Sequence, residues 1–303
     1  MNIEPNSPQE DVYENLRPLL FSIAYGIVGS VTEAEDIVQE ALLRYHREGP
    51  KQAEIESAKA WLSTVTTRLA INHVRSARVR RETYPGIWLP EPLLTDPSPD
   101  ASQQAETADS LSMAFLVLLE SLSPAERAVF LLREVFEYDY DEIAEVVGKS
   151  QENCRQILVR ARRRIEEKKP RFEASRRRRE ELARRFFDAV GDGDSEGLLD
   201  MLAADVVSYS DGGGKASAFL HPIHGRDRVG RVLLGFAGWR ERLGADEMQL
   251  ADINGQPGAV FRNADGDAVL VVSLDIADGL VQAFRAITNP EKLRHLGRGV
   301  SHR

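Results

Sequence analysis

The chain has 303 residues and a formal net charge of −9, with 42% hydrophobic residues, 29% charged residues and one cysteine. This composition supports packed cores and excludes a wholly disordered chain. The lone Cys154 excludes an internal disulfide, and zinc-binding spacings are absent. No apolar run reaches the roughly eighteen residues of a membrane span, and the polar N-terminus is unlike a signal peptide. We therefore expect a cytoplasmic protein with no membrane partner, no metal and no cofactor.

Positive charge is concentrated in two stretches of this acidic chain. Residues 61–84 hold five arginines and one acid, and residues 149–185 hold fifteen basic against six acidic residues. Residues 1–60 carry eleven acids against five bases, and residues 186–303 carry seventeen against twelve. A chain of this kind can hold DNA locally while repelling it elsewhere.

The first part of the chain has helical apolar spacing. It predicts a helix from about residue 11 to residue 28, a second over 33–45 and a third over 59–81. The second is expected to open with a capping box of Thr32 and Glu35. Residues 84–107 contain five prolines, which forbid a continuous helix. This stretch is a linker, although it carries the apolar run Trp88, Leu89, Pro90.

A helix-turn-helix is predicted after the linker. Helix is expected over 109–122 and again after Ser123, which precedes Pro124. The run 140–156 then supplies a helix, a glycine suited to a tight turn (Gly148) and a second helix capped by Ser150. The residues expected near a DNA groove or phosphates are Gln151, Asn153, Arg155, Gln156, Arg160 and Arg162. The alternative is a pair of charged surface helices in a bundle.

The helix over 59–81 offers a second set of DNA-binding candidates. Basic and hydrogen-bonding groups beside an irregular loop can hold a separated strand. The set is Arg68, Asn72, His73, Arg75 and Arg78. Taken alone, this pattern also fits a solvated helix.

The last third reads as an α+β domain. Two short helices are predicted over 182–190 and 196–202, followed by strands over 206–210, 259–262, 268–275 and 280–287. Three turn pairs punctuate the later part in the manner of antiparallel hairpins. They are Asn254-Gly255, Asp265-Gly266 and Asp278-Gly279.

The helical part resembles sigma factors of bacterial RNA polymerase. The runs AEDIVQEAL at 34–42, AWL at 60–62 and RLAIN at 68–72 are similar to their second conserved region. LSPAER at 122–127, through residue 162, resembles their fourth region. Two regions joined by a short linker are similar to the extracytoplasmic-function class, which implies core RNA polymerase (its clamp helices and flap) and promoter DNA as partners.

The resemblance assigns roles to individual residues. Asp36, Gln39 and Glu40 match the surface that docks on the clamp helices. The matches to the helix that melts and reads the −10 element are Arg68, Asn72, His73 and Arg75, which Arg78 follows. Arg155 and Gln156 match the −35 recognition helix.

The last third resembles the SnoaL-like, nuclear-transport-factor-2-like cone. Three segments, 88–90, 211–215 and 289–293, resemble an extracytoplasmic-function subgroup with this extension, which implies control of activity in cis. The expected interdomain residues are Trp88, Leu89, Pro90, Asp211, Gly212, Gly213, Gly214, Lys215, Asn289, Pro290 and Leu293. A plain hairpin loop at 211–215 and a frayed tail after residue 288 are the alternatives.

The predicted architecture is therefore multidomain: two all-α sigma domains, the second with a helix-turn-helix, followed by an α+β cone-shaped domain. The expected boundaries are 8–82 for region 2, 83–107 for the linker, 108–170 for region 4 and 176–303 for the SnoaL-like domain.

Two other functions are weighed against a sigma factor. A ligand-responsive repressor or activator would bind palindromic DNA as a dimer. An enzyme fused to a DNA-binding module would need an acid–base pair in the cone, and His221 and His224 have no recognisable carboxylate partner. We therefore expect no enzyme and name no catalytic residue. The cone fold leaves room for a small-molecule ligand in the C-terminal domain.

Overall fold

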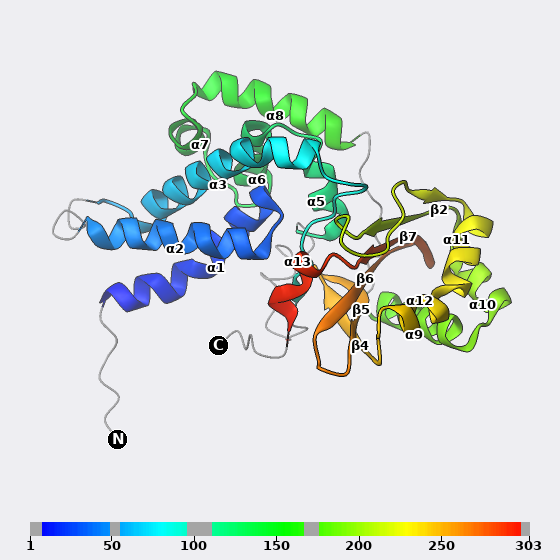
Figure 1. The fold of residues 1–303 in the computed structure, drawn as a ribbon. Coiled ribbons are helices and arrows are strands. Elements are labelled where there is room, and N and C mark those ends of the chain that lie inside the picture. The colour runs from blue at the N-terminus through cyan, green and yellow to red at the C-terminus, as the bar shows by residue number, and fades with distance from the viewer. Residues whose placement is uncertain (1–7, 49–54, 96–110, 167–175, 298–303) are drawn as a thin grey trace. The chain divides into compact units, whose positions relative to one another are not determined.

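The computed structural model describes residues 8–48, 55–95, 111–166 and 176–297. The chain divides into two compact units, one formed by 1–79 with 118–169 and the other by 80–117 with 170–303. The described part of the first unit is helical, whereas the second contains a sheet with helices (Figure 1). This agrees with the predicted fold class. None of the described helices is long and apolar enough to cross a membrane.

The first unit is built on helices that precede and follow the linker in sequence. They are α1 (Pro8–Val28), α2 (Val31–Arg47), α3 (Ala58–Glu82), α6 (Pro124–Glu134), α7 (Tyr140–Val147) and α8 (Gln151–Glu166). α1 packs against both α2 and α6. Its side chains Leu20, Ile23 and Ile27 are fully buried, as their helical spacing predicts.

Helix starts in this unit are set by serine caps. The Ser123 hydroxyl accepts a hydrogen bond from the Glu126 N–H, and the Glu126 carboxylate accepts one from the Ser123 N–H, so this predicted cap is confirmed. The predicted cap of α2 at Thr32 is wrong. Ser30 is the cap, and its hydroxyl accepts from the Glu33 N–H at 3.2 Å. The earlier start brings Val31 into the helix, where its side chain is buried.

The second unit is organised around a seven-stranded sheet of order β1-β4-β5-β6-β7-β2-β3. The strands are β1 (Leu94–Thr95), β2 (Leu202–Asp211), β3 (Ile223–His224), β4 (Glu247–Ile253), β5 (Gln256–Arg262), β6 (Ala268–Ala277) and β7 (Leu280–Ile287). β2 and β7 are parallel, and every other pair is antiparallel. Asn254-Gly255 and Asp278-Gly279 have positive φ at both residues, as the predicted two-residue hairpin turns require.

Several elements of this unit were not predicted from sequence. They are the strands β1, β3 and β4 and the helices α11 (Arg226–Leu234) and α12 (Phe236–Arg242). The first four residues of β4 are exposed, so this strand lacks the buried alternation that identifies a strand. β1 and β3 have two residues each, which is too short for any periodic pattern.

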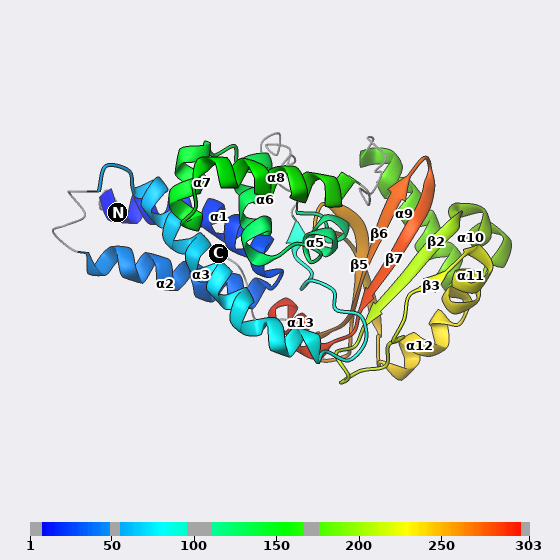
Figure 2. The ribbon, with the colours of Figure 1, turned by 90° about the horizontal axis from the view of Figure 1, so that it is seen from above.

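One face of the sheet carries helices and an aromatic core. α9 (Arg176–Asp192), α10 (Ser195–Met201), α11 and α12 lie on this side (Figure 2). Five buried phenylalanines fill the space between them and the strands. The centroids of neighbouring rings lie 5.4–6.4 Å apart, in the spatial order Phe187, Phe186, Phe284, Phe236, Phe261. Three of these rings, Phe187, Phe236 and Phe261, also line a pocket of about 190 Å³.

The opposite face is covered by the proline-rich stretch and the C-terminal helix. Leu89 is fully buried and packs in one cluster with Val260, Val271 and Ile287 of the sheet. The same cluster contains Met113, the first residue of α5 (Met113–Leu119), and Leu293 of α13 (Pro290–Leu293). The stretch expected to be a linker thus contributes core side chains and the edge strand β1 to the second unit.

Removal of a core ring should destabilise this unit strongly. Phe186→Ala deletes a fully buried ring of the aromatic cluster and should cost about 3–5 kcal/mol. The matched change Phe219→Ala removes a ring that is 45% exposed and should cost less than about 1 kcal/mol. Urea unfolding followed by far-UV circular dichroism measures both, and equal costs would show that the cluster is not the core.

Candidate nucleic-acid interface and linker site

The helix-turn-helix has the geometry that the sequence predicts. Asp139 and Glu142 form a capping box at the start of α7. Gly148 ends α7 with φ 65° and ψ 44°, a left-handed conformation that glycine adopts without strain. The Ser150 hydroxyl accepts from the Asn153 N–H at 3.2 Å and begins α8. The turn is therefore fixed at both ends by local chemistry.

The outer face of α8 displays every side chain of the predicted −35 set. Cys154, Ile157, Leu158 and Ala161 are buried against the unit. The exposed members are Gln151, Asn153, Arg155, Gln156, Arg160 and Arg162. Arg155 lies 4.8 Å from the centroid of the Tyr140 ring, which holds the guanidinium near the start of the helix.

Some of the basic side chains of α8 are held by acidic residues of α6. Arg162 makes two bonds to the Glu134 carboxylate, at 2.7 and 3.0 Å. Arg164 pairs with Glu126 at 3.0 Å. A guanidinium held in this way has fewer free N–H groups for a phosphate, so Arg160, with no such partner described, is the better placed.

The predicted polymerase-binding and −10 sets face each other across α2 and α3. A groove of about 380 Å³ separates the two helices, with Asp36 and Glu40 on one wall and Asn72 and His73 on the other. The His73 Nε2 lies 2.7 Å from a carboxylate oxygen of Glu33. Three described residues of the sets do not line this groove: Gln39 is exposed on α2, Arg75 is exposed further along α3, and Arg68 lies elsewhere. The side chain of Arg78 lies outside the described residues.

Arg68 has a different environment from the rest of the −10 set. Its guanidinium donates to the backbone carbonyls of Glu145 (2.7 Å) and Val146 (3.1 Å), at the end of α7. It therefore bonds to the helix-turn-helix in this structure.

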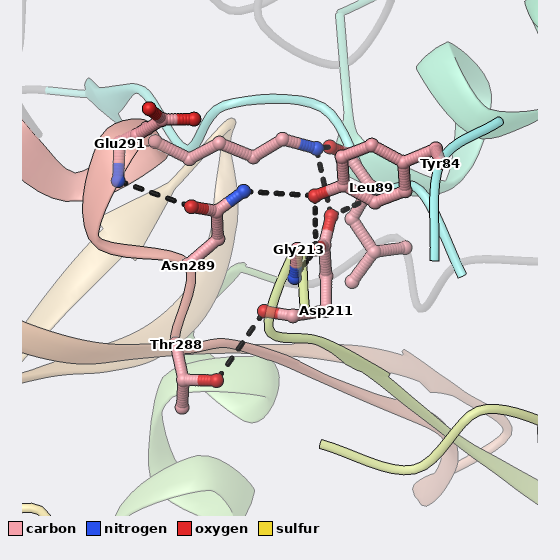
Figure 3. A network of polar contacts seen from close by, with 8 residues as sticks. Tyr84, Leu89, Asp211, Gly213, Thr288, Asn289 and Glu291 are labelled. Atoms are coloured by element: carbon pink, nitrogen blue, oxygen red, sulfur yellow. Dashed lines mark hydrogen bonds and ion pairs between the residues drawn. The ribbon is translucent and has the colours of Figure 1, made fainter. Parts of the chain in front are cut away.

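In the second unit, one buried carboxylate bonds to residues from the three segments that the sequence predicts to be interdomain: 88–90, 211–215 and 289–293. Asp211 ends β2 and has no exposed surface. Its Oδ1 accepts from the Tyr84 hydroxyl (2.5 Å) and the Gly213 N–H (3.1 Å). Its Oδ2 accepts from the Leu89 N–H and the Lys292 ammonium, both at 2.7 Å. Figure 3 shows these donors converging on the carboxylate. All of its strong acceptor positions are thus used.

Lys292 is the counter-charge of this site. Its side chain is buried and its ammonium also donates to the Leu89 carbonyl. The same nitrogen lies 4.2 Å from the centroid of the Trp88 ring and 4.9 Å from that of Tyr84. A buried ammonium needs such partners, because desolvation without them costs several kcal/mol. The cation therefore binds both the carboxylate and the aromatic residues of the 84–89 segment.

The end of β7 completes the network. The backbone N–H groups of Thr288 and Asn289 both donate to the Asp211 carbonyl. The Asn289 side chain caps α13 through the Glu291 N–H (3.0 Å) and donates to the Tyr84 hydroxyl at 2.8 Å. Leu293 is buried, whereas Pro290 is exposed. Residues 289–293 are therefore an ordered cap in this structure.

The glycines after Asp211 let this turn lie close to Pro85 and Asn289. Gly213 and Gly214 have φ of 59° and 70°. A Cβ on Gly213 would lie 2.2 Å from the Asn289 amide nitrogen, and one on Gly214 would lie 2.7 Å from a ring carbon of Pro85. Gly212 is also closed to a side chain, by the Ala216 carbonyl. Lys215 points away from this core and pairs with Glu291 at the surface.

The segment stays attached to the sheet after Pro90, which is itself buried. The His295 Nε2 lies 2.8 Å from the Pro92 carbonyl. Leu93 and Asn254 exchange two hydrogen bonds, and β1 then pairs with Ile253 and Asp252 of β4. We call residues 84–95 the clamped segment, because hydrogen bonds along it join it to the sheet and to residues 292–295 of the same unit.

Sequence reasoning missed two members of this site, Tyr84 and Lys292. Tyr84 lies four residues before the apolar run and has no neighbour in sequence that signals its partner. Lys292 stands within the 289–293 motif, but lysine is ordinarily exposed and its burial follows only from the tertiary fold. The histidines His221 and His224 are both exposed, and no metal-binding group of three side chains gathers in the described residues.

Comparison with known proteins identifies both helical parts. Residues 12–80 match the family Sigma-70 region 2, and residues 112–165 match Sigma-70, region 4. The chain is 35% identical to the ECF RNA polymerase sigma factor SigJ of Mycobacterium tuberculosis, over 96% of this chain and 98% of that protein. The chain belongs to the extracytoplasmic-function (ECF) sigma factors.

Further relatives agree with this assignment over the full length. The probable ECF sigma factor SigI of Mycobacterium tuberculosis is 31% identical over 95% of this chain and 96% of its own. The crystal structure of M. tuberculosis SigJ superposes with a TM-score of 0.75 at 33% identity, covering 96% of this chain and all of that one. As an ECF sigma factor, the chain directs core RNA polymerase to promoters through regions 2 and 4 and initiates transcription there.

Two substitutions in region 4 should distinguish a residue that reads a base from a residue that contacts a phosphate. Gln156→Ala removes an amide that can bond an adenine edge, so it should cost about 1–3 kcal/mol and relax specificity at one −35 position. Arg160→Ala should weaken binding to all sequences and reduce the salt dependence by about one phosphate. Fluorescence anisotropy with −35 duplexes at several salt concentrations measures both, and identical profiles for the two variants would contradict the assignment.

Tyr84 should ionise only at high pH. Burial and then the neighbouring Asp211 carboxylate raise the pKa of Tyr84 above its ordinary value of about 10. Because the folded pKa is the higher one, the stabilisation is complete below about pH 10 and declines as the unfolded chain ionises above it. Burial also raises the pKa of Tyr13 and Tyr138, so tyrosinate absorbance should show several more residues titrating near pH 10 in urea than in the folded protein. In Tyr84→Phe this difference should fall by one residue; an unchanged difference would assign it to the other tyrosines.

Proposed function

We propose that the C-terminal domain controls initiation in cis by holding the clamped segment, residues 84–95, of the linker between regions 2 and 4. The supporting observation is the Asp211 carboxylate, which binds Tyr84 and Leu89 of that segment together with Lys292 of the domain. The predicted ranges, 83–107 for the linker and 176–303 for the C-terminal domain, divide the chain by sequence. In this proposal residues 84–95 of the linker bind to the C-terminal domain.

The consequence is a shorter tether between the two DNA-reading regions. A free linker of 25 residues (83–107) reaches at most about 85 Å at ~3.4 Å per residue. Fixing residues 84–95 holds 12 of these 25 residues at one end-to-end distance, so they cannot extend further when regions 2 and 4 separate. The −10 and −35 elements lie roughly 25 base pairs apart, or about 85 Å at 3.4 Å per step. A formed clamp therefore restrains the separation that promoter binding requires.

The finer partner surfaces follow from the residues on α2 and α8. Asp36 and Gln39 are exposed on α2, and Glu40 beside them pairs with Arg44 at 2.7 Å. We assign this acidic surface to the clamp helices of core polymerase, and region 4 to its flap and the −35 element. We assign the −10 element to the exposed polar residues of α3.

For the C-terminal domain we propose a protein-contact role in place of catalysis or ligand binding. The five phenylalanines fill much of the interior where a cone fold would hold a substrate, and the pocket left beside them has about 190 Å³, less than the roughly 300–1,000 Å³ of common ligand pockets. The buried ion pair Lys292–Asp211 is bound to the chain's own linker. These features support a domain whose ligand is residues 84–95.

Breaking the clamp should raise initiation. Lys292→Met leaves the Asp211 carboxylate buried without its counter-charge, at a cost of about 3–5 kcal/mol, which is enough to release the segment. Run-off transcription with core polymerase and limiting sigma factor should then yield more product than the wild type. The matched control Lys215→Met breaks only a surface pair and should behave as wild type.

A truncation after Thr288 removes the same ammonium together with the α13 cap and should act in the same direction. Circular dichroism of each variant checks that the sheet remains folded. Unchanged yields from both Lys292→Met and the truncation would refute control by the clamp, whereas absence of promoter-dependent initiation from the wild type would refute the sigma-factor function itself.

A further inference from the structure

Arg68 binds the C-terminal end of α7, which is the end of a helix that attracts a cation. The last carbonyls of a helix have no partner within the helix, and the helix dipole places partial negative charge there. Arg68 extends from α3 in region 2 and donates from Nη2 to the Glu145 carbonyl and from Nε to the Val146 carbonyl. These are two of the last three residues of α7, the first helix of the helix-turn-helix. The two parallel bonds use the fork geometry that only arginine offers.

Two further contacts join regions 2 and 4 within the same compact unit. The Tyr138 hydroxyl, just before α7, donates to the Ser63 hydroxyl of α3 at 2.6 Å, and both side chains are buried. Arg127 of α6 is buried and donates to the Ile27 carbonyl of α1 at 2.6 Å. Regions 2 and 4 are therefore held against each other by hydrogen bonds at three separate places.

This closed arrangement cannot read a whole promoter. The −10 and −35 elements are separated by about 85 Å, at 3.4 Å for each of roughly 25 base pairs. α3 has 25 residues and spans only about 38 Å. While Arg68 of α3 touches α7, the −10 helix and the recognition helix α8 cannot each occupy its own element. Regions 2 and 4 must separate before both are bound.

We propose that Arg68 is a latch that holds regions 2 and 4 closed in the free sigma factor and is released when core polymerase binds. Its two duties compete, because the bonds to α7 occupy two of its five N–H groups and hold regions 2 and 4 together, whereas promoter binding requires these regions to separate. Ser63–Tyr138 and Arg127–Ile27 support the closed form, but Arg68 is the member that the sequence also assigns to promoter DNA. This proposal stands apart from the Asp211 clamp, which lies in the other unit.

The direct test measures the distance between the two regions in the free, full-length protein. Spin labels are placed at Leu43→Cys on α2 and Val159→Cys on α8, both exposed, in a Cys154→Ala background. Arg68→Ala should raise the ratio of open to closed molecules in double electron–electron resonance about three- to tenfold, the loss expected for one or two exposed charge-assisted bonds. Arg68→Lys should give an intermediate ratio, because an ammonium replaces only part of the fork.

Arg75→Ala is the matched control, because Arg75 is an exposed arginine of the same helix with the same predicted DNA role and no described bond to region 4. It should leave the distance distribution unchanged. A distribution for Arg68→Ala that equals that of Arg75→Ala would overturn the latch.

A second measurement tests whether core polymerase must open the latch. In the absence of DNA, Arg68→Ala should bind core polymerase about three- to tenfold more tightly than the wild type, because less free energy is spent on opening. Arg75→Ala should bind as the wild type does. A residue that only contacts DNA would change neither the distance nor this affinity. Equal affinities for Arg68→Ala and wild type would overturn release by core polymerase.

Discussion

A buried carboxylate is stable only when hydrogen bonds and an opposite charge compensate its lost hydration, and this requirement organises the C-terminal half of the protein. Asp211 has no exposed surface and satisfies the requirement with donors from three distant parts of the sequence. Removal of Lys292 would leave the Asp211 charge uncompensated in a low-dielectric core, and removal of the linker would leave the hydrogen bonds from Tyr84 and Leu89 unmade. The linker, the glycine turn and the C-terminal cap are therefore held together as one structure.

The same face of the sheet explains why a proline-rich stretch became part of a domain. Its prolines exclude a helix and favour extended backbone, which is the conformation that can lie along a sheet edge and form β1. Leu89 supplies the apolar anchor and Trp88 the aromatic face for the ammonium of Lys292. The opposite face is largely filled by phenylalanines, whereas this face bonds to the chain's own linker.

The helical half uses arginine in two ways that compete. Arginines on α8 and α3 provide the charge that DNA needs, yet several are bound within the protein, to Glu134, to Glu126 and to the end of α7. An arginine held in this way can contact a phosphate or base only with its remaining N–H groups or after its internal bond is broken. Where the bond breaks, the free energy of breaking it is subtracted from that of DNA binding.

The sequence by itself determined the features that depend on neighbours in the chain. The Ser123 cap, the Gly148 turn, the buried stripe of α8 and the hairpins at 254–255 and 278–279 follow from local spacing and backbone preference, and all are present. The α2 start differs by two residues because Ser30 and Thr32 can both cap a helix, and burial of Val31 decided between them. Only the tertiary structure decided that Tyr84 and Lys292 meet at Asp211 and that Arg68 bonds α7. These contacts join residues 77 to 127 positions apart, over which no periodic pattern carries information, so their energies appear only when the chain has folded.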